Sequence, residues 1–242
     1  MSSIQNITTE ETALIEEVIA KYCPMKNIGF DKEGRPLIYI DMSADSKGLT
    51  SSIKRADFIR FGCWTVENST EMMKKKSKEL GKHVYQVVFI ANFDGMTFAQ
   101  ATSKKALELM LLAVTVFQDN YPERINAVYV INGSIYFSMV WSVVKQFLAP
   151  AVIKKFIIYG TDKWREDLLK IIDPSELPAF IGGTRADPDG NPRCNTFYVT
   201  CDTDIMILKL FTIDELMEDR LFGASLSDDE EVIPPPFKEK LN

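Results

Sequence analysis

The sequence predicts an α/β fold in which helices flank a mostly parallel sheet. Four apolar stretches of strand length alternate with longer stretches whose apolar residues recur at helical spacing. The strand-like stretches are residues 36–41, 84–93, 125–131 and 156–160. Because strands that alternate with helices join through right-handed crossovers, we expect these four to lie parallel in one sheet.

The first part of the chain predicts two helices around the first strand. A short helix is expected over residues 10–23, where Pro24 ends it. A longer helix is expected over residues 51–80, with Gly62 and Cys63 as the place where it would break.

The middle of the chain contains its most apolar strand and a long uncharged stretch. Residues 84–93 are apolar on both faces, which is typical of a central strand covered on both sides. A long helix is expected over residues 98–121. Residues 125–144 carry no charge and are long enough to span a membrane. Their pattern of strand, Asn-Gly-Ser turn and helix instead predicts a buried globular core.

The last part of the chain changes character after a predicted helix at residues 164–172. The turn-rich stretch 182–192 marks the edge of the folded body. Residues 225–242, rich in acidic residues and proline, are expected to be disordered. The other elements expected here are short strands at 197–199 and 205–211 and a short helix at 213–222.

The charge of the chain is concentrated at its C-terminus. The net charge is −6, and residues 202–242 hold 11 acidic and 4 basic side chains, which leaves residues 1–201 at +1. A body so close to neutral excludes the strongly basic surface that nucleic-acid binding requires. The N-terminus has neither a basic region nor an apolar core of a signal peptide, so we expect a cytoplasmic protein with reduced cysteines.

The sequence lacks the common catalytic and cofactor signatures. It has one histidine, His83, and four scattered cysteines, which excludes a multi-histidine metal site and a disulfide scaffold. It contains no dinucleotide-binding glycine motif, no phosphate-binding loop and no nucleophile elbow. We therefore expect a binding protein without a cofactor rather than an enzyme, and an enzyme acting through His83 is the least favoured interpretation.

The predicted helix over residues 137–148 is apolar over an unusually wide arc. Its polar residues cover roughly 100° of the helical wheel, and its apolar residues cover roughly 200°. A surface helix needs about half of that apolar arc to pack on a sheet. Two interpretations remain open: the helix is buried on two sides, or one of its faces lines a lipid-filled cavity or contacts a membrane.

Four segments carry a family resemblance: VVFIANFDGM, NYPERINAVYVIN, FLAPAVIKKFIIYG and LPAFIGGTRADPDGNPRC. Together they resemble the CRAL-TRIO lipid-binding family, to which the yeast phosphatidylinositol transfer protein, the supernatant protein factor and the α-tocopherol transfer protein belong. The similarity covers about residues 24–195. It implies a lipid pocket with the sheet as its floor and a movable gate helix, here residues 137–148, over its mouth.

The resemblance also implies a domain organisation. Residues 1–23 correspond to a remnant of the family's N-terminal helical bundle, and residues 24–195 to the lipid-binding domain. Residues 196–224 form a C-terminal extension, too short with the acidic tail 225–242 for the β-sandwich of the supernatant-protein-factor branch.

Two charged residues match the phosphatidylinositol headgroup positions of the family, Glu123 and Lys155. The resemblance assigns the inositol hydroxyls to Glu123 and the phosphate to Lys155. Val152 stands where a threonine helps to bind the inositol phosphate. Phe89 and Ala91 stand where hydroxyl residues hold phosphatidylcholine. These departures count against choline lipids and favour a neutral hydrophobic ligand. The side chains expected to line the pocket or the gate are Phe89, Ala91, Phe117, Val130, Phe137, Val140, Trp141, Val144, Phe147 and Leu148.

The expected function is transfer of one hydrophobic lipid between membranes, with transient contact at the membrane surface. The ligand would be phosphatidylinositol or a neutral isoprenoid such as tocopherol, squalene or a retinoid. The alternative is a lipid-sensing interaction module without transfer activity, in which the acidic C-terminal tail binds a protein partner.

Overall fold

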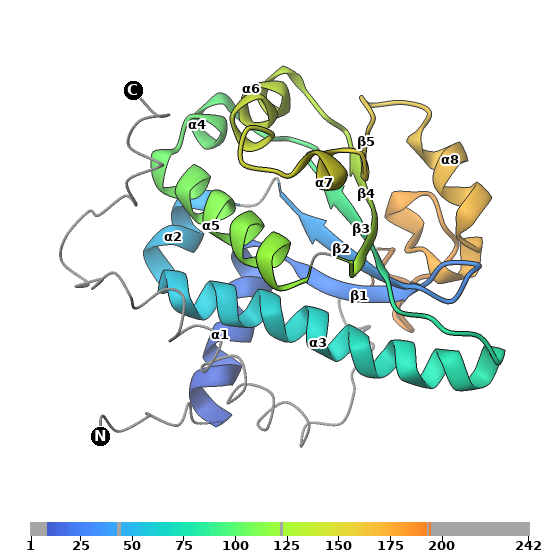
Figure 1. The fold of residues 1–242 in the computed structure, drawn as a ribbon. Helices are drawn as coiled ribbons and strands as arrows, with labels where there is room; N and C mark the ends of the chain where they lie inside the picture. Colours follow the sequence, from blue (N-terminus) through green and yellow to red (C-terminus); the bar gives the residue numbers. More distant parts are fainter. Residues whose placement is uncertain (1–8, 43–44, 122, 193, 195–242) are drawn as a thin grey trace.

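The chain forms a five-stranded sheet in a computed structural model that describes residues 9–42, 45–121, 123–192 and 194 (Figure 1). The spatial order of the strands follows the sequence, β1-β2-β3-β4-β5. β1 pairs with β2 antiparallel, and the other neighbours are parallel. The predicted mostly parallel sheet is therefore confirmed. The strands are β1 (Met25–Phe30), β2 (Pro36–Asp41), β3 (Val87–Asn92), β4 (Ile125–Ile131) and β5 (Phe156–Ile158).

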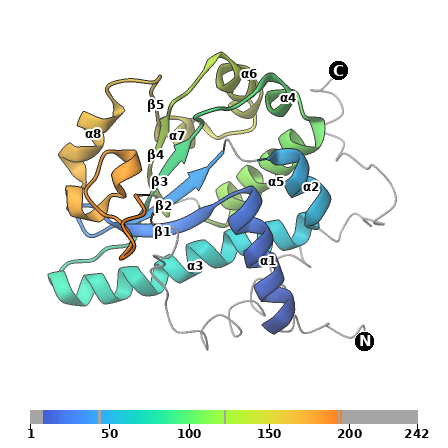
Figure 2. The same ribbon diagram turned by 180° about the vertical axis from the view of Figure 1, so that it is seen from behind.

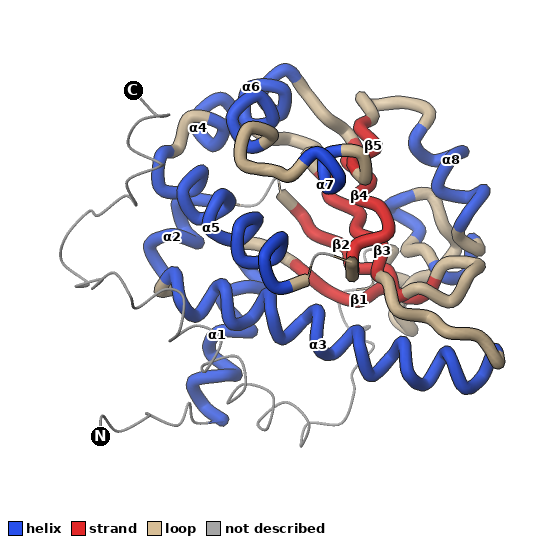
Figure 3. Tube along the Cα trace, in the orientation of Figure 1, coloured by secondary structure: helices blue, strands red, loops and turns tan. Residues whose placement is uncertain are grey.

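Helices cover both faces of this sheet (Figure 3). Figure 2 shows α1 and α2 at one side of the molecule and α8 at the other, with α3 running below the sheet from one side to the other. The α-helices are α1 (Thr9–Tyr22), α2 (Ser46–Ser52), α3 (Arg55–Leu80), α4 (Phe98–Ala101), α5 (Lys104–Asn120), α6 (Ile135–Val144), α7 (Pro150–Ile153) and α8 (Trp164–Ile171). Two short 3-10 helices follow, Pro174–Glu176 and Ala179–Ile181.

The two faces of the sheet belong to different cores because successive strand residues point to opposite sides. Tyr39 and Ile90 pack on one face with Trp164 and Leu168 of α8. Phe89 and the other residues of the opposite face pack toward α3, α5 and α6. β3, the central strand, is thus covered on both sides, as its double-faced apolar pattern predicts.

The carboxyl ends of β3 and β4 are tied together by a polar network. Asn132 donates a hydrogen bond from Nδ2 to Oδ1 of Asn92 (2.9 Å) and accepts one from Nε1 of Trp164 (3.1 Å). Asn92 in turn donates to the hydroxyl of Tyr39 (3.0 Å). Asn132 has a φ of 57°, a left-handed conformation that asparagine tolerates better than most residues. The network therefore fixes the turn between β4 and α6.

Several predicted boundaries move in the structure. The helix expected over 98–121 is two helices, because Thr97 and Gln100 form a capping box for α4 and the Ser103 hydroxyl caps α5. The helix expected over 137–148 is α6, which begins at Ile135 after the cap Ser134 and ends at Val144. Strand β1 was not expected.

The helix expected over 51–80 breaks after α2 and not at Gly62. Ile53 and Lys54 are extended, whereas α3 continues through Gly62. A Cβ at Gly62 would lie 2.8 Å from Cζ of Phe117, so the glycine is needed for close packing of α3 on α5. The predicted elements at 197–199, 205–211, 213–222 and 225–242 lie outside the described residues.

Candidate lipid cavity

An internal cavity of about 250 Å³ lies between one face of the sheet and the helices that cover it. Its lining side chains come from all five strands and from α1 to α6, including the segments that join them. The sheet supplies its floor, as expected.

The floor is built from alternate residues of neighbouring parallel strands. Phe89 and Ala91 of β3 line the cavity, and so do Val128 and Val130 of β4. The register pairs Phe89 with Val128 and Ala91 with Val130, which brings all four side chains to one face. A small residue at 91 beside three larger ones leaves room above the centre of the sheet.

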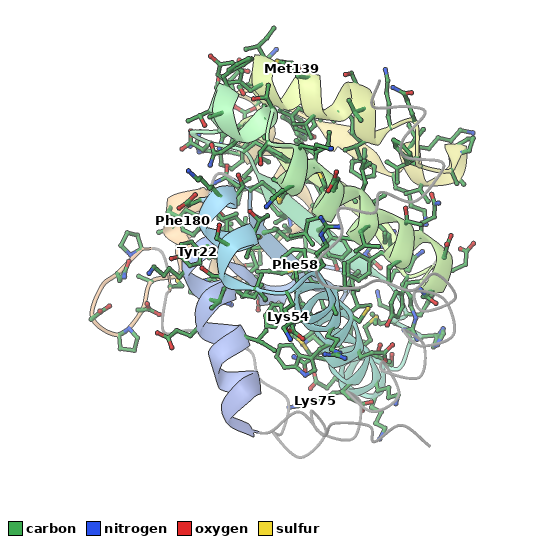
Figure 4. The ribbon with its side chains drawn as sticks, turned by 90° about the vertical axis from the view of Figure 1, so that its left-hand side faces the viewer. Tyr22, Lys54, Phe58, Lys75, Met139 and Phe180 are labelled. Atoms are coloured by element: carbon green, nitrogen blue, oxygen red, sulfur yellow. The ribbon has the colours of Figure 1, made fainter. Side chains whose placement is uncertain are left out.

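The roof of the cavity is the helix α6. The Ser134 hydroxyl accepts a hydrogen bond from the Phe137 N–H and begins the helix. Phe137, Val140 and Val144 are buried and line the cavity. Met139 points the other way, where 41% of its surface is exposed, and Figure 4 shows it at the outer side of this helix. The wide apolar arc of the sequence therefore divides into a face on the cavity and a face on the surface.

Aromatic rings join α6 to the floor. The ring of Phe137 lies 4.6 Å from the ring of Phe93, centroid to centroid, and the ring of Trp141 lies 4.7 Å from that of Phe156. Both distances fall in the range of favourable aromatic pairs. Among the described residues, α6 itself makes no hydrogen bond to a strand, so these ring contacts are what joins the roof to the sheet.

Within the part of the chain that the structure describes, the lining is almost wholly apolar and includes no basic residue. Asp41 is the one acidic residue among the described residues that line it. Cys23 also lines the cavity, and burial, with a further contribution from Asp41, raises the pKa of its thiol to about 12. A phosphate inside this cavity would meet no cationic side chain from the described residues, so this lining suits hydrocarbon better than an anion.

Eight of the ten side chains expected in the pocket or gate line this cavity. They are Phe89, Ala91, Phe117, Val130, Phe137, Val140, Trp141 and Val144. Phe147 and Leu148 do not line it; they follow the end of α6 and pack against the surrounding core. Sequence reasoning missed the side formed by Tyr22, Met42 and Phe58, two of which Figure 4 labels, because no local pattern brings α1, β2 and α3 together.

The expected headgroup residues lie outside the cavity. Glu123 is exposed. Lys155 is half-buried, and its Nζ donates a hydrogen bond to the Ile125 carbonyl (2.6 Å). Lys155 immediately precedes Phe156, which lines the cavity, so its ammonium group belongs to the surroundings of the cavity and not to its interior. Val152, on α7, is buried in the same core.

Comparison with known proteins identifies the family. Residues 23–183 match the CRAL/TRIO domain, so the chain belongs to the CRAL-TRIO family. It is 34% identical over 170 residues to the phosphatidylinositol/phosphatidylcholine transfer protein SFH9 of Arabidopsis thaliana, covering 69% of this chain and 29% of that protein. It is 35% identical over 184 residues to SFH12 of the same plant, with 74% and 33% covered. These relatives are transfer proteins rather than enzymes, and the chain spans about a third of their length.

A solved structure supports the fold. The crystal structure of Sfh5 superposes with a TM-score of 0.54 at 15% sequence identity, covering 89% of this chain and 68% of that one. In the part of this chain that the structure describes, no helix has both the length and the apolarity needed to cross a membrane. The same residues contain no group of three His, Cys, Asp or Glu side chains placed to hold a metal ion.

Proposed function

We propose that the chain takes up one lipid molecule, with its hydrocarbon part in the cavity, and carries it between membranes. The observation that carries this proposal is the cavity between the sheet and α6, whose lining is apolar apart from a few polar side chains and Asp41 at the end of β2. Burial contributes about 0.8 kcal/mol per methylene group, so a chain of about fourteen methylenes contributes about 11 kcal/mol. A membrane offers a similar amount, so exchange is nearly thermoneutral and opening of the cavity limits its rate.

The size of the cavity indicates which part must move. Sites for small molecules typically enclose about 300–1,000 Å³, more than the ≈ 250 Å³ found here. A lipid with two acyl chains therefore requires the cavity to widen. The roof helix α6 is the element whose displacement widens it without disturbing the sheet.

Phosphatidylinositol and a neutral isoprenoid are the two candidate ligands. The names of the Arabidopsis relatives favour a phospholipid, whose phosphate would lie outside the cavity next to Lys155. The absence of a basic residue from the described lining, and the bond that Lys155 already makes to the Ile125 carbonyl, favour a neutral ligand.

Contact with the membrane is assigned to an exposed apolar patch on α4 and α6. Phe98, Ile135 and Met139 are 57%, 73% and 41% exposed. α4 and α6 lie side by side, and the Phe98 ring is 6.2 Å from that of Tyr136. Insertion of this patch would bring the roof of the cavity to the lipid surface, where release and uptake must occur.

Two measurements test this function. Mass spectrometry of an organic extract of the purified protein should find one lipid species at close to one molecule per chain. Exchange of that lipid between vesicles should then accelerate in proportion to protein concentration. A lipid-sensing module would retain lipid without accelerating exchange, and a protein that neither retains nor exchanges lipid would contradict both functions.

A further inference from the structure

The helix α6 is held at its N-terminal end by backbone bonds to the neighbouring strand segment. The Asn132 N–H donates to the Gly160 carbonyl (3.1 Å), and the Gly133 N–H donates to the Tyr159 carbonyl (3.0 Å). A Cβ at Gly133 would lie 2.9 Å from the same Tyr159 oxygen, so this approach is close. With the Asn132 side chain fixed as described above, this end of α6 is rigidly attached.

At the other end of the helix, the side chain of Gln118 bonds to the loop that follows it. Gln118, near the end of α5, accepts a hydrogen bond at Oε1 from the Ala149 N–H (2.6 Å). Its Nε2 donates a longer bond to the Phe147 carbonyl (3.5 Å). Both partners belong to the loop that follows α6, and they lie 29 and 31 residues away in the sequence.

Between these two attachments α6 is held only by apolar contacts. Among the described residues, the hydrogen bonds of residues 135–146 all stay within the segment 134–147. The helix can therefore leave the cavity without breaking a polar bond along its length. Its release depends on the two ends, and these differ: backbone bonds attach the first to the neighbouring strand segment, and the Gln118 amide bonds the loop that follows the second.

We propose that Gln118 is a positioning residue for lipid exchange, a latch whose bonds to Phe147 and Ala149 keep α6 over the cavity. The helix opens about the Asn132–Gly133 attachment and releases at the Gln118 end. This inference rests on the proposed function, because it names the contact that controls access to the same cavity. The amide side chain of Gln118 is half-buried, so water can replace its two bonds once the side chain rotates.

Hydrogen exchange followed by mass spectrometry tests the latch without any lipid. Gln118→Leu replaces the amide with an apolar side chain that is one atom shorter, and it removes both bonds. Deuterium uptake in the peptide covering residues 135–149 should rise at least threefold at early times, while uptake in β3 and β4 stays unchanged. Gln118→Glu keeps the short bond from the Ala149 N–H and should restore most of the protection.

A matched control separates the latch from general destabilisation. Gln86 also joins two partners, since Nε2 donates to the Glu123 carbonyl (3.2 Å) and Oε1 accepts from Asn126 Nδ2 (3.1 Å). Gln86→Leu removes a comparable pair of bonds far from α6, so uptake over 135–149 should not change. The proposed role of Gln118 is contradicted if Gln118→Leu leaves deuterium uptake over residues 135–149 at the wild-type value. It is also contradicted if uptake in β3 and β4 rises as much as uptake over residues 135–149. Vesicle exchange is measured in a separate experiment. If the wild-type protein does not accelerate exchange, the transfer function is contradicted. The deuterium uptake over residues 135–149 tests only the role of Gln118.

Discussion

The ring of Phe137, on the roof helix, lies 4.6 Å from the ring of Phe93, directly after the central strand. This pair closes the cavity at the end where β3 and β4 terminate. Both residues are buried and both line the cavity, so the closed position of α6 depends on apolar contact with the sheet.

A charge under the roof should open the cavity without unfolding the domain. Val144 is 4% exposed and lines the cavity, so Val144→Asp places an unpaired carboxylate in an apolar site, at a cost of several kcal/mol if α6 stays closed. Displacement of α6 relieves that cost. We expect a folded protein by circular dichroism that retains no lipid and no longer accelerates vesicle exchange. Leu168→Asp, in the core on the opposite face of the sheet, should unfold. If the Val144→Asp protein is unfolded, α6 is part of the hydrophobic core and cannot move away from the cavity.

Loss of Lys155 should weaken binding of phosphoinositides selectively. Lys155→Ala removes the ammonium group beside the cavity, and Glu123→Ala removes the carboxylate assigned to the inositol hydroxyls. Both variants should lower the affinity for phosphatidylinositol by roughly ten-fold or more in a vesicle competition assay, since hydrogen bonds to charged groups contribute about 1.5–3 kcal/mol. Binding of a neutral lipid should not change. The exposed neighbour Lys154 offers the control Lys154→Ala. If both variants bind phosphatidylinositol as tightly as the wild type does, the headgroup assignment is contradicted. Neutral lipids would then be the remaining candidate ligands.

The apolar patch should control attachment to membranes. Ile135→Ser and Met139→Ser remove exposed apolar surface from α6 without touching the cavity. The double variant should sediment less with phosphatidylcholine vesicles and should exchange lipid more slowly at an unchanged melting temperature. Leu80→Ser removes a similarly exposed residue, 47% exposed, at the far end of α3 and should have no effect. Equal losses in both proteins would show that the position of the patch is irrelevant.

The buried thiols should make stability fall at alkaline pH. Burial raises the pKa of Cys23 to about 12 and that of Cys63 to about 11, from an ordinary value near 9. Above pH 9 the unfolded chain therefore loses thiol protons that the native protein keeps, so the free energy of unfolding declines with pH up to about 11 or 12 and is undiminished below 9. Urea unfolding at pH 8 and 10 measures this, and Cys63→Ala should reduce the difference. Rapid alkylation of Cys23 or Cys63 at pH 8 in the native protein would contradict the burial of these thiols.

The alternation of strands and helices could be read from the sequence because each element has a strong local pattern. Strand β2, for example, spans Pro36–Asp41, the same residues that its apolar pattern and the preceding turn predict. Strand β1 escaped notice because Lys26, Asn27 and Gly29 interrupt its apolar pattern, and its pairing with β2 is what makes it a strand.

The candidate site was predictable only in part for a related reason. The helical wheel showed only the wide apolar arc of the roof helix, and the family resemblance assigned it to the gate. Strand alternation places Phe89 and Ala91 on one face. The α1 side of the cavity and the bonds of Gln118 arise from contacts between residues distant in the chain. An amide that binds a backbone group about thirty residues away leaves no pattern in the sequence.

The most direct test of the cavity as the carrier site is a vesicle exchange assay on a protein whose cavity is filled. Ala91 lies at the centre of the floor and is small, so Ala91→Trp should occupy the space that the lipid chain would take. The assay follows pyrene-labelled phosphatidylinositol, and in parallel the lipid that co-purifies, between donor and acceptor vesicles. The account predicts that the wild type accelerates exchange of one of these lipids and that folded Ala91→Trp protein, still bound to vesicles, does not. Equal exchange by the two proteins would show that lipid does not travel in this cavity.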